Sequence, residues 1–260
     1  MPVADLSLLE EAARKAGEVA LNYWGGTFQH WDKPEDAGPV TEADLAVNDL
    51  LHDILMSARP DYGWLSEETQ DDPKRLNKER CFIIDPIDGT RSFMAGEKTW
   101  SHSIAVVEQG QVIAGVVYLP AKDVMYRAAR GQGAFVGKDR MHIKTGDHIK
   151  QARILANRAV MTSGHWITGA APTFERHHRP SLAYRMALVA EGRFDGMLTL
   201  RPTWEWDVAA GVLMVQEAGG VVCDRTGTSV LFNNATPQSK GLIATDSVLC
   251  DQILARLDGA

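Results

Sequence analysis

Cys81-Phe82-Ile83-Ile84-Asp85-Pro86-Ile87-Asp88-Gly89-Thr90 is the segment from which the architecture of this 260-residue chain can be worked out. Its four leading apolar residues predict a short buried strand that stops at Asp85-Pro86. Because the proline fixes the backbone, Asp85 and Asp88 can turn toward one point instead of alternating across a sheet. Gly89 and Thr90 then offer backbone N–H groups and a hydroxyl to an anion. The same residues also suit an ordinary turn, so the segment alone leaves both interpretations open.

Two helices are expected before this strand. Ser7-Leu8-Leu9-Glu10 is a capping-box pattern ahead of apolar residues at helical spacing as far as Tyr23, and Gly25-Gly26 would end that helix. A second helix should run from Thr41 to about Ser57. The stretch 27–39 between them holds Asp, Lys, Pro and Gly and predicts a loop.

The chain after Thr90 shows two successive patterns. Strands are expected at 103–107 and 112–118, joined by a turn at 108–110, and again at 124–129 and 134–136. From Gln151 onward strands (154–156, 196–200, 221–223, 242–244) alternate with helices (181–191, 207–218, 248–257). These patterns predict a mixed α/β (α+β) protein in two halves. The boundary is expected within 137–150, which gives an N-terminal half, 1–140, and a C-terminal half, 141–260.

The composition limits the class of protein. The chain is 45% hydrophobic, enough for a sizeable core, and its formal net charge of -7 disfavours binding to nucleic acid polymers or anionic membranes. Three widely spaced cysteines without a CxxC pair argue against a disulfide framework or a zinc site. The N-terminus lacks the pattern of a signal peptide, and no uncharged apolar run approaches the ~20 residues of a membrane span. These features predict a soluble cytoplasmic protein that needs bound cations or local arginines to hold an anion.

Acidic residues recur where expected strands and helices meet. Besides Asp85 and Asp88, they are Glu67-Glu68, the Asp207 of Glu205-Trp206-Asp207, and Asp44 in the first turn of the second helix. Each has an ordinary alternative. Asp207 is a common helix-start residue, Asp44 completes a capping box with Thr41, and Glu67-Glu68 could be a solvated loop. No single one of them decides the matter.

Together these motifs resemble those of one family. The segment 85–90, Trp206-Asp207-Val208-Ala209-Ala210-Gly211 and Glu217-Ala218-Gly219-Gly220 look like the signature segments of the inositol monophosphatase family. That family belongs to the lithium-sensitive, magnesium-dependent phosphatases that also include fructose bisphosphatases. The resemblance runs from the first helix to beyond Asp224. It implies a layered αβαβα sandwich, a small phosphorylated metabolite as substrate and a possible homodimer.

The resemblance also implies residue roles. Glu67 and Asp85, with the Ile87 carbonyl, would bind a first Mg²⁺, and Glu67 counts among the catalytic residues as well. Asp85, Asp88 and Asp207 would hold a second ion. Asp44 and Thr90 would orient the attacking water, with Gly89 beside the phosphate, and Glu68 is a candidate for a third ion. The physics agrees, because Mg²⁺ prefers oxygen ligands and clustered carboxylates repel one another unless cations neutralise them.

The segment before Asp207 bears on the substrate. Thr199-Leu200-Arg201-Pro202-Thr203 lacks the glutamate with which inositol monophosphatases bind inositol hydroxyls. Pro202-Thr203 and the segment 181–185 look more like 3′(2′),5′-bisphosphate nucleotidases, although Arg185 stands where those have lysine. The resemblance implies hydrolysis of adenosine 3′,5′-bisphosphate to AMP, with Arg185 or Arg201 on the second phosphate. Either arginine could instead be a surface residue paired with Asp195 or Glu191. Inositol 1-phosphate and histidinol phosphate are alternative substrates, and a regulatory binding protein with a retained metal site is an alternative of another class.

Several other conspicuous residues are expected to be structural. We expect Trp100, Trp204 and Trp206 to pack in the protein rather than stack on bases, and His102 to be a core histidine. His177-His178 is expected in a solvated loop. Arg91 directly follows the 85–90 motif, and the sequence leaves open whether it faces the site.

Overall fold

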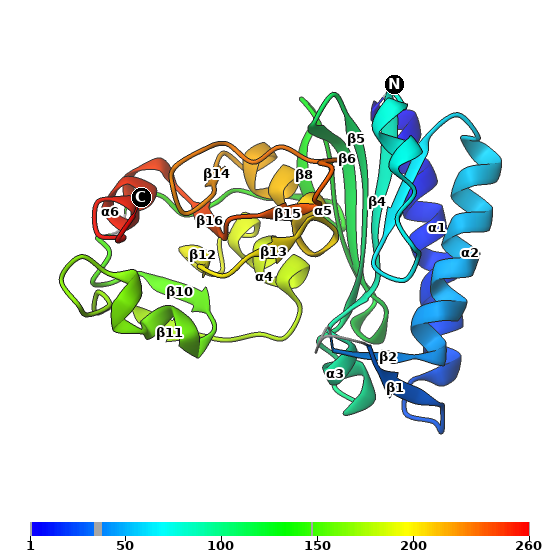
Figure 1. Ribbon diagram of the computed structural model, residues 1–260, viewed down its shortest axis with the longest axis horizontal. Coiled ribbons are helices and arrows are strands. Elements are labelled where there is room, and N and C mark those ends of the chain that lie inside the picture. The colour runs from blue at the N-terminus through cyan, green and yellow to red at the C-terminus, as the bar shows by residue number, and fades with distance from the viewer. Residues whose placement is uncertain (1, 34–37, 147, 260) are drawn as a thin grey trace.

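A seven-stranded sheet forms the centre of the larger half of the molecule (Figure 1). The computed structural model describes residues 2–33, 38–146 and 148–259. In spatial order the strands are β3 (Gly63–Ser66), β4 (Arg80–Asp88), β5 (Ser101–Glu108), β6 (Gln111–Leu119), β7 (Val124–Ala129), β8 (Gly133–Val136) and β9 (Asp139–Arg140). β3 and β4 are parallel, and the remaining neighbours are antiparallel.

Both faces of this sheet are covered by helices. Phe82 and Ile84 of β4 pack with α1 (Pro2–Tyr23) and α2 (Glu42–Ala58). Cys81 and Ile83 of the same strand point to the other face, toward α4 (Leu182–Ala190) and α5 (Glu205–Glu217). A strand buried on both faces needs apolar residues at every position, which explains the continuous apolar run in the sequence.

A five-stranded sheet lies on the far side of α4 and α5 (Figure 1). Its order is β11 (Glu175–His177), β10 (Arg153–Ala156), β12 (Gly196–Thr199), β16 (Leu242–Thr245) and β14 (Val221–Cys223). The last helix, α6 (Ser247–Leu254), packs Leu249 and Ile253 against the outer face of this sheet. The succession of helix pair, sheet, helix pair, sheet and helix confirms the predicted αβαβα sandwich.

Short elements complete the chain. Two small antiparallel pairs are β1 (His30–Asp32) with β2 (Pro39–Thr41), and β13 (Thr203–Trp204) with β15 (Gln238–Ser239). One short helix, α3 (Thr90–Met94), follows β4, and 3-10 turns occur at Pro73–Asn77, Pro120–Lys122, Arg158–Met161 and Ser163–His165. Within the described residues, no helix combines the length and apolar character needed to cross a membrane.

The predicted boundaries differ from the structure in several places. The first helix begins at Pro2, so Ser7 lies inside it and donates its hydroxyl to the Val3 carbonyl instead of capping. The strand predicted to stop at Asp85-Pro86 continues to Asp88, with an irregular register to β5 between Asp85 and Asp88. This irregularity accommodates a proline that cannot donate to the ladder.

Three other boundaries are close to their predictions. α2 begins as expected, with Thr41 as its N-cap and Asp44 completing the capping box. α5 begins at Glu205, two residues before its predicted start, and the last helix ends at Leu254 instead of residue 257. The loop expected at 27–39 contains β1 and part of β2, and its residues 34–37 lie outside the described residues.

Candidate active site

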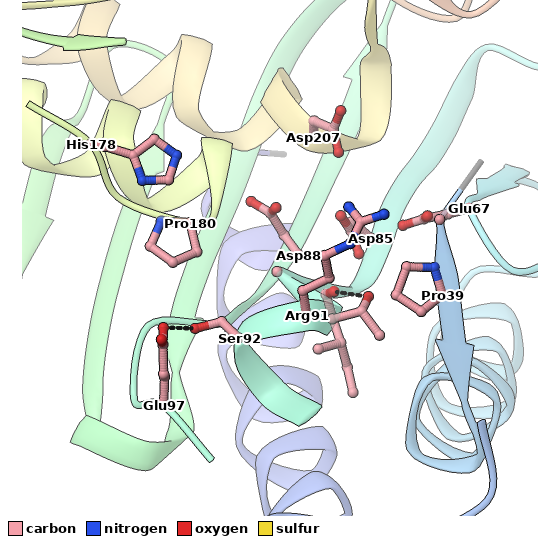
Figure 2. Close-up of a pocket in the computed structure, with 14 residues that line it drawn as sticks. Pro39, Glu67, Asp85, Asp88, Arg91, Ser92, Glu97, His178, Pro180 and Asp207 are labelled. Carbon is pink, nitrogen blue, oxygen red and sulfur yellow. Dashed lines mark hydrogen bonds between the residues drawn. The ribbon is translucent and has the colours of Figure 1, made fainter. Parts of the chain in front are cut away.

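Three acidic side chains from two distant segments meet at one end of the large sheet. Asp85 and Asp88 come from the irregular end of β4, and Asp207 comes from the first turn of α5. Each has a carboxylate oxygen within 4.8 Å of one in each of the other two. Figure 2 shows these three and Glu67 around one pocket of about 500 Å³, a volume typical of small-molecule sites. The structure therefore brings four of the acidic residues that the sequence singled out, Glu67, Asp85, Asp88 and Asp207, to one pocket.

The Asp85 carboxylate lies in an environment that disfavours its negative charge. Its side chain is buried, and its Oδ1 atom has no hydrogen-bond partner. Burial raises the pKa of Asp85 well above its ordinary value, and the nearby charges of Glu67 and Asp88 raise it further. Burial likewise raises the pKa of Asp207, with Asp88 and Glu67 adding to the effect. A cation held by oxygen ligands would relieve this repulsion, so the donor set fits a divalent metal ion such as Mg²⁺.

Asp88 is fixed from the α4 side of the pocket. Its Oδ2 atom accepts hydrogen bonds from the Ser181 hydroxyl at 2.6 Å and from the Ala183 backbone N–H at 2.7 Å. Burial raises the pKa of Asp88 to about 6, although these hydrogen bonds lower it. Ser181 is also the N-cap of α4. The start of α4 therefore positions a carboxylate that β4 supplies.

Asp44 combines the two roles considered for it from the sequence. Its Oδ2 atom accepts from the Thr41 N–H at 2.9 Å and the Thr41 hydroxyl at 2.5 Å, as a capping residue would. Its Oδ1 atom lies 3.3 Å from the Thr90 hydroxyl, which also lies 3.2 Å from the Ile87 carbonyl. Burial raises the pKa of Asp44 to about 6. Capping and proximity to the pocket are thus compatible. Gly89, whose φ of 103° favours glycine, makes the turn that brings Thr90 into place.

A lysine that the sequence did not indicate joins two of the acidic residues. Lys33 Nζ lies 2.7 Å from Glu67 Oε1 and 2.6 Å from Glu68 Oε1. Burial opposes its charge, but the two carboxylates outweigh burial and the pKa of Lys33 is raised. The Glu68 side chain is only 5% exposed, and burial raises its pKa to about 7. Glu68 is therefore not the solvated loop residue that one interpretation allowed.

The arginines considered for a second phosphate line an adjoining cavity of about 240 Å³, which Asp88 and Asp207 also border. Arg185 is 5% exposed and donates to the carbonyls of Arg179 and Pro180, and burial lowers its pKa to about 10. Arg201 is exposed at the same cavity.

The carboxylates that might have paired with these arginines are engaged elsewhere in the described structure. Asp195 accepts from the Arg153 N–H and pairs with Lys144, and Glu191 accepts from Tyr126. Among the described residues, no ion pair joins Arg185 or Arg201 to Asp195 or Glu191.

The other conspicuous residues of the sequence are either buried or border the pocket and the surface. Trp100 is fully buried, and His102 is buried with Nδ1 bonded to the Pro86 carbonyl, although its Nε2 atom has no partner. Arg91 lines the main pocket, as Figure 2 shows, and so does His178, which the sequence placed in a solvated loop. Trp204 is 40% exposed, so packing accounts for only part of its surface.

Known proteins share this sequence pattern along almost the whole chain. An inositol-1-monophosphatase of Caulobacter vibrioides is 33% identical over 270 residues, covering 96% of this chain and 99% of that protein. A 3′(2′),5′-bisphosphate nucleotidase of Aggregatibacter actinomycetemcomitans is 32% identical and covers 90% of each chain. A histidinol-phosphatase of Mycobacterium tuberculosis and Nus factor SuhB of Haemophilus influenzae are each 32% identical as well.

The fold and the family profile agree with these relatives. The solved structure of the Thermotoga maritima IMPase matches with a TM-score of 0.83 and 31% identity, over 98% of this chain and 96% of that one. The profile described as "Inositol monophosphatase family" matches residues 4–259. The acidic residues of its two motifs converge in one pocket, on a fold shared along the full length. This chain therefore belongs to the inositol monophosphatase family, whose members are phosphatases.

Proposed function

We propose that the chain is a magnesium-dependent phosphatase that hydrolyses a phosphate monoester of a small metabolite, with water as the nucleophile. The observation that carries the proposal is the convergence of Asp85, Asp88 and Asp207 within 4.8 Å. The buried Asp85 Oδ1 atom, which has no hydrogen-bond partner, adds to it. Hard oxygen donors in a carboxylate-rich pocket suit Mg²⁺ better than softer metals.

In this proposal the metal ligands divide into two sets that share Asp85. Glu67, Asp85 and the Ile87 carbonyl would hold one ion, and Asp85, Asp88 and Asp207 a second. Glu68, beside Glu67, would serve a third. When bound, the ions would activate water and stabilise the leaving oxygen.

The residues beside the metal ligands would handle the water and the phosphate. The Thr90 hydroxyl, 3.3 Å from Asp44 Oδ1, can hold a water through its lone pair while it donates to the carboxylate. With a pKa of about 6, Asp44 can accept a proton near neutral pH. The Gly89 and Thr90 backbone N–H groups would face a phosphate oxygen.

We further propose a 3′(2′),5′-bisphosphate nucleotide, such as adenosine 3′,5′-bisphosphate, as the substrate. Arg185 and Arg201 line a cavity that adjoins Asp88 and Asp207, where a second phosphate could bind. The segment 199–203, the neighbourhood in which inositol monophosphatases carry an acid, has none here, and its Leu200 is buried. Inositol 1-phosphate is the main alternative, because relatives of similar identity carry that name. Histidinol phosphate is another for the same reason.

A phosphate-release screen tests the proposal. Metal-free protein would be assayed with and without Mg²⁺ on adenosine 3′,5′-bisphosphate, inositol 1-phosphate, fructose 1,6-bisphosphate and histidinol phosphate. We expect no turnover without Mg²⁺, the highest kcat/KM on the bisphosphate nucleotide, and inhibition by Li⁺ relative to K⁺ at equal ionic strength. Full activity in the metal-free protein would overturn the phosphatase assignment, and a preference for inositol 1-phosphate would overturn the nucleotidase assignment.

Arginine variants test the second-phosphate site separately. A charge-assisted hydrogen bond is worth about 1.5–3 kcal/mol, so Arg185→Ala or Arg201→Ala should lower kcat/KM on the bisphosphate by roughly 10- to 150-fold. The loss on inositol 1-phosphate should be much smaller. Arg185→Lys should keep most of the activity because it keeps the charge, and Arg14→Ala, on the surface, serves as the control. Equal losses on both substrates would contradict the assignment.

The alternative from another functional class is a regulatory binding protein with a retained metal site. One relative, named Nus factor SuhB, makes this alternative worth testing. If the protein with Mg²⁺ released phosphate from none of the four substrates, that result would favour the binding protein.

A cytoplasmic location is part of the proposal, supported by free thiols at Cys81, Cys223 and Cys250. A homodimer stays a prediction that light scattering can test.

A further inference from the structure

A third cavity beside the carboxylates has an aromatic wall. Its volume is about 430 Å³, and Trp204 and Trp206 line it together with Arg201, next to Glu67 and Asp207. The two indoles are stacked, with ring centroids 4.6 Å apart and planes 9° from parallel. Trp204 keeps 40% of its surface exposed. One tryptophan face is therefore covered by its neighbour while the side chain still borders an open cavity.

Both indoles stand on backbone that lies in regular secondary structure. Trp204 lies in β13, where it pairs with Gln238 of β15. Trp206 lies in the first turn of α5, its carbonyl accepts from the Ser103 hydroxyl at 2.9 Å, and its side chain packs on the core. A surface that is already ordered loses little conformational entropy when a ligand stacks on it.

We propose that Trp204, supported by Trp206, is a stacking platform for a planar aromatic ring in the leaving group of the substrate. In the bisphosphate nucleotide of the proposed function, on which this inference rests, that ring is the purine base. Asp207 borders all three cavities, and Arg201 borders both the aromatic cavity and the cavity of Arg185. One ligand can therefore place its scissile phosphate at the carboxylates, its second phosphate at the arginines and its base on the indoles.

The chemistry of the cavity wall favours an aromatic ring over a polyol such as inositol. A base presents a π face that stacks on an indole without directional hydrogen bonds. An inositol ring instead needs donors and acceptors for its hydroxyls. The segment 199–203, in which an inositol-binding acid is expected, has none, and Lys33 on the cavity is engaged by Glu67 and Glu68. The platform thus selects the leaving group, while the carboxylates act on the phosphate.

The test compares ligands with and without a base. Calorimetry would measure the binding of AMP and of ribose 5-phosphate to wild type, Trp204→Ala and Trp204→Phe in the presence of Mg²⁺. Base-on-aromatic stacking predicts that Trp204→Ala weakens AMP binding by about 5- to 150-fold and leaves ribose 5-phosphate binding unchanged. Trp204→Phe should restore most of the AMP affinity because it restores a ring. The kcat/KM on adenosine 3′,5′-bisphosphate should follow the same order.

The outcomes separate this inference from the proposed function. Equal weakening of both ligands, or unchanged AMP binding, would overturn the platform even if wild type prefers the bisphosphate nucleotide. Selective weakening of AMP binding would support the platform even if wild type prefers inositol 1-phosphate. In that case only the proposed nucleotide substrate would be wrong. A Trp204→Ala variant that changes the molecular mass in solution without affecting AMP would show a contact between copies and overturn the platform.

Discussion

The Asp88 carboxylate is held by two donors although its charge is disfavoured in the protein without metal. Ser181 and Ala183 fix one oxygen, while burial raises the pKa of Asp88 to about 6. An arrangement that holds a group in place against its own electrostatic preference is common at functional sites. The same group is therefore expected to affect activity and stability in opposite directions.

Asp88→Asn tests this expectation. The substitution keeps the volume but removes the charge, so we expect kcat to fall by roughly 10²-fold or more. The unfolding temperature without Mg²⁺ should stay equal or rise, because a repulsive charge has been removed. Asp53→Asn, at a side chain that is 86% exposed, is the control and should change neither quantity. Lost activity accompanied by lost stability would show that the variant is simply misfolded.

His102 makes the stability of the protein depend on pH through its contact with the irregular end of β4. Its Nδ1 atom bonds to the Pro86 carbonyl, and burial lowers the pKa of His102 to about 4. The unfolded chain, with a histidine pKa near 6.5, therefore binds the proton first, so stability is lost as pH falls from about 6.5 toward 4. At about pH 5 this loss amounts to roughly 2 kcal/mol.

His102→Gln should remove that dependence. Between about pH 7.5 and pH 5, the unfolding free energy of wild type should fall by about 2 kcal/mol relative to the variant. Urea unfolding in a chelator measures it. The buried carboxylates, whose raised pKa values act in the opposite direction, are present in both proteins and cancel in the comparison. His142→Gln, at an exposed histidine, should behave like wild type. Parallel pH curves for wild type and His102→Gln would rule out this account.

At the scale of elements, a hydrogen-bond chain ties the start of α5 to the start of β3. Glu205 accepts from Asn234 at 2.6 Å and from the Asn233 N–H at 2.6 Å. Arg75 donates to the Asn233 side chain at 2.6 Å and packs against Gly63, the first residue of β3. α5 carries Asp207 and β3 leads into Glu67, so we expect these contacts to help set the distance between two proposed metal ligands.

Glu205→Gln and Glu217→Gln form a matched pair on one helix. Glu217, at the other end of α5, accepts from the Gly131 and Gly133 N–H groups. Either glutamine would present an amide N–H₂ to a donor, so each should cost about 1–3 kcal/mol of stability. Only Glu205→Gln should also weaken Mg²⁺ binding, measured by calorimetry, because only Glu205 shares the first turn of α5 with the proposed ligand Asp207. Equal effects on Mg²⁺ affinity would refute the positioning role.

These elements also show what the sequence could and could not predict. The capping box at Thr41 and the apolar run 81–84 are local signals, and the helix and the strand that they predict are both present. Arg75 and Asn233 are 158 positions apart, and Lys33 reaches Glu67 from a loop with no pattern of its own. Contacts of this kind depend on tertiary packing, which leaves no spacing in the sequence. The acidic cluster could be predicted from the sequence because its residues stand where regular elements begin or end.

At the scale of the whole molecule, the two halves of the chain share one core. Val117 and Ala128 of the large sheet belong to the same buried cluster as Leu213 of α5 and Ala244 of the second sheet. The division proposed near residue 140 therefore separates two stretches of chain whose stability depends on each other. α5 carries Asp207 and packs between the two sheets. Its position against the large sheet should therefore affect the stability of both halves and the geometry of the pocket.

Gly115→Ala tests the packing of α5 against the large sheet. A methyl group at Gly115 would lie 3.0 Å from Ala210 Cα, so α5 would have to move away from β6. Overpacking of this kind costs about 1–3 kcal/mol, and the displaced Asp207 should weaken Mg²⁺ binding as well. Tryptophan fluorescence and far-UV circular dichroism should still report one coincident unfolding transition, because both halves lose the shared core together. Gly164→Ala, where an added methyl meets nothing within 4 Å, is the matched control and should leave both measurements unchanged. Two separate transitions, with the Mg²⁺ affinity intact, would instead mean that each half folds by itself and that the packing of α5 against β6 does not set the position of Asp207.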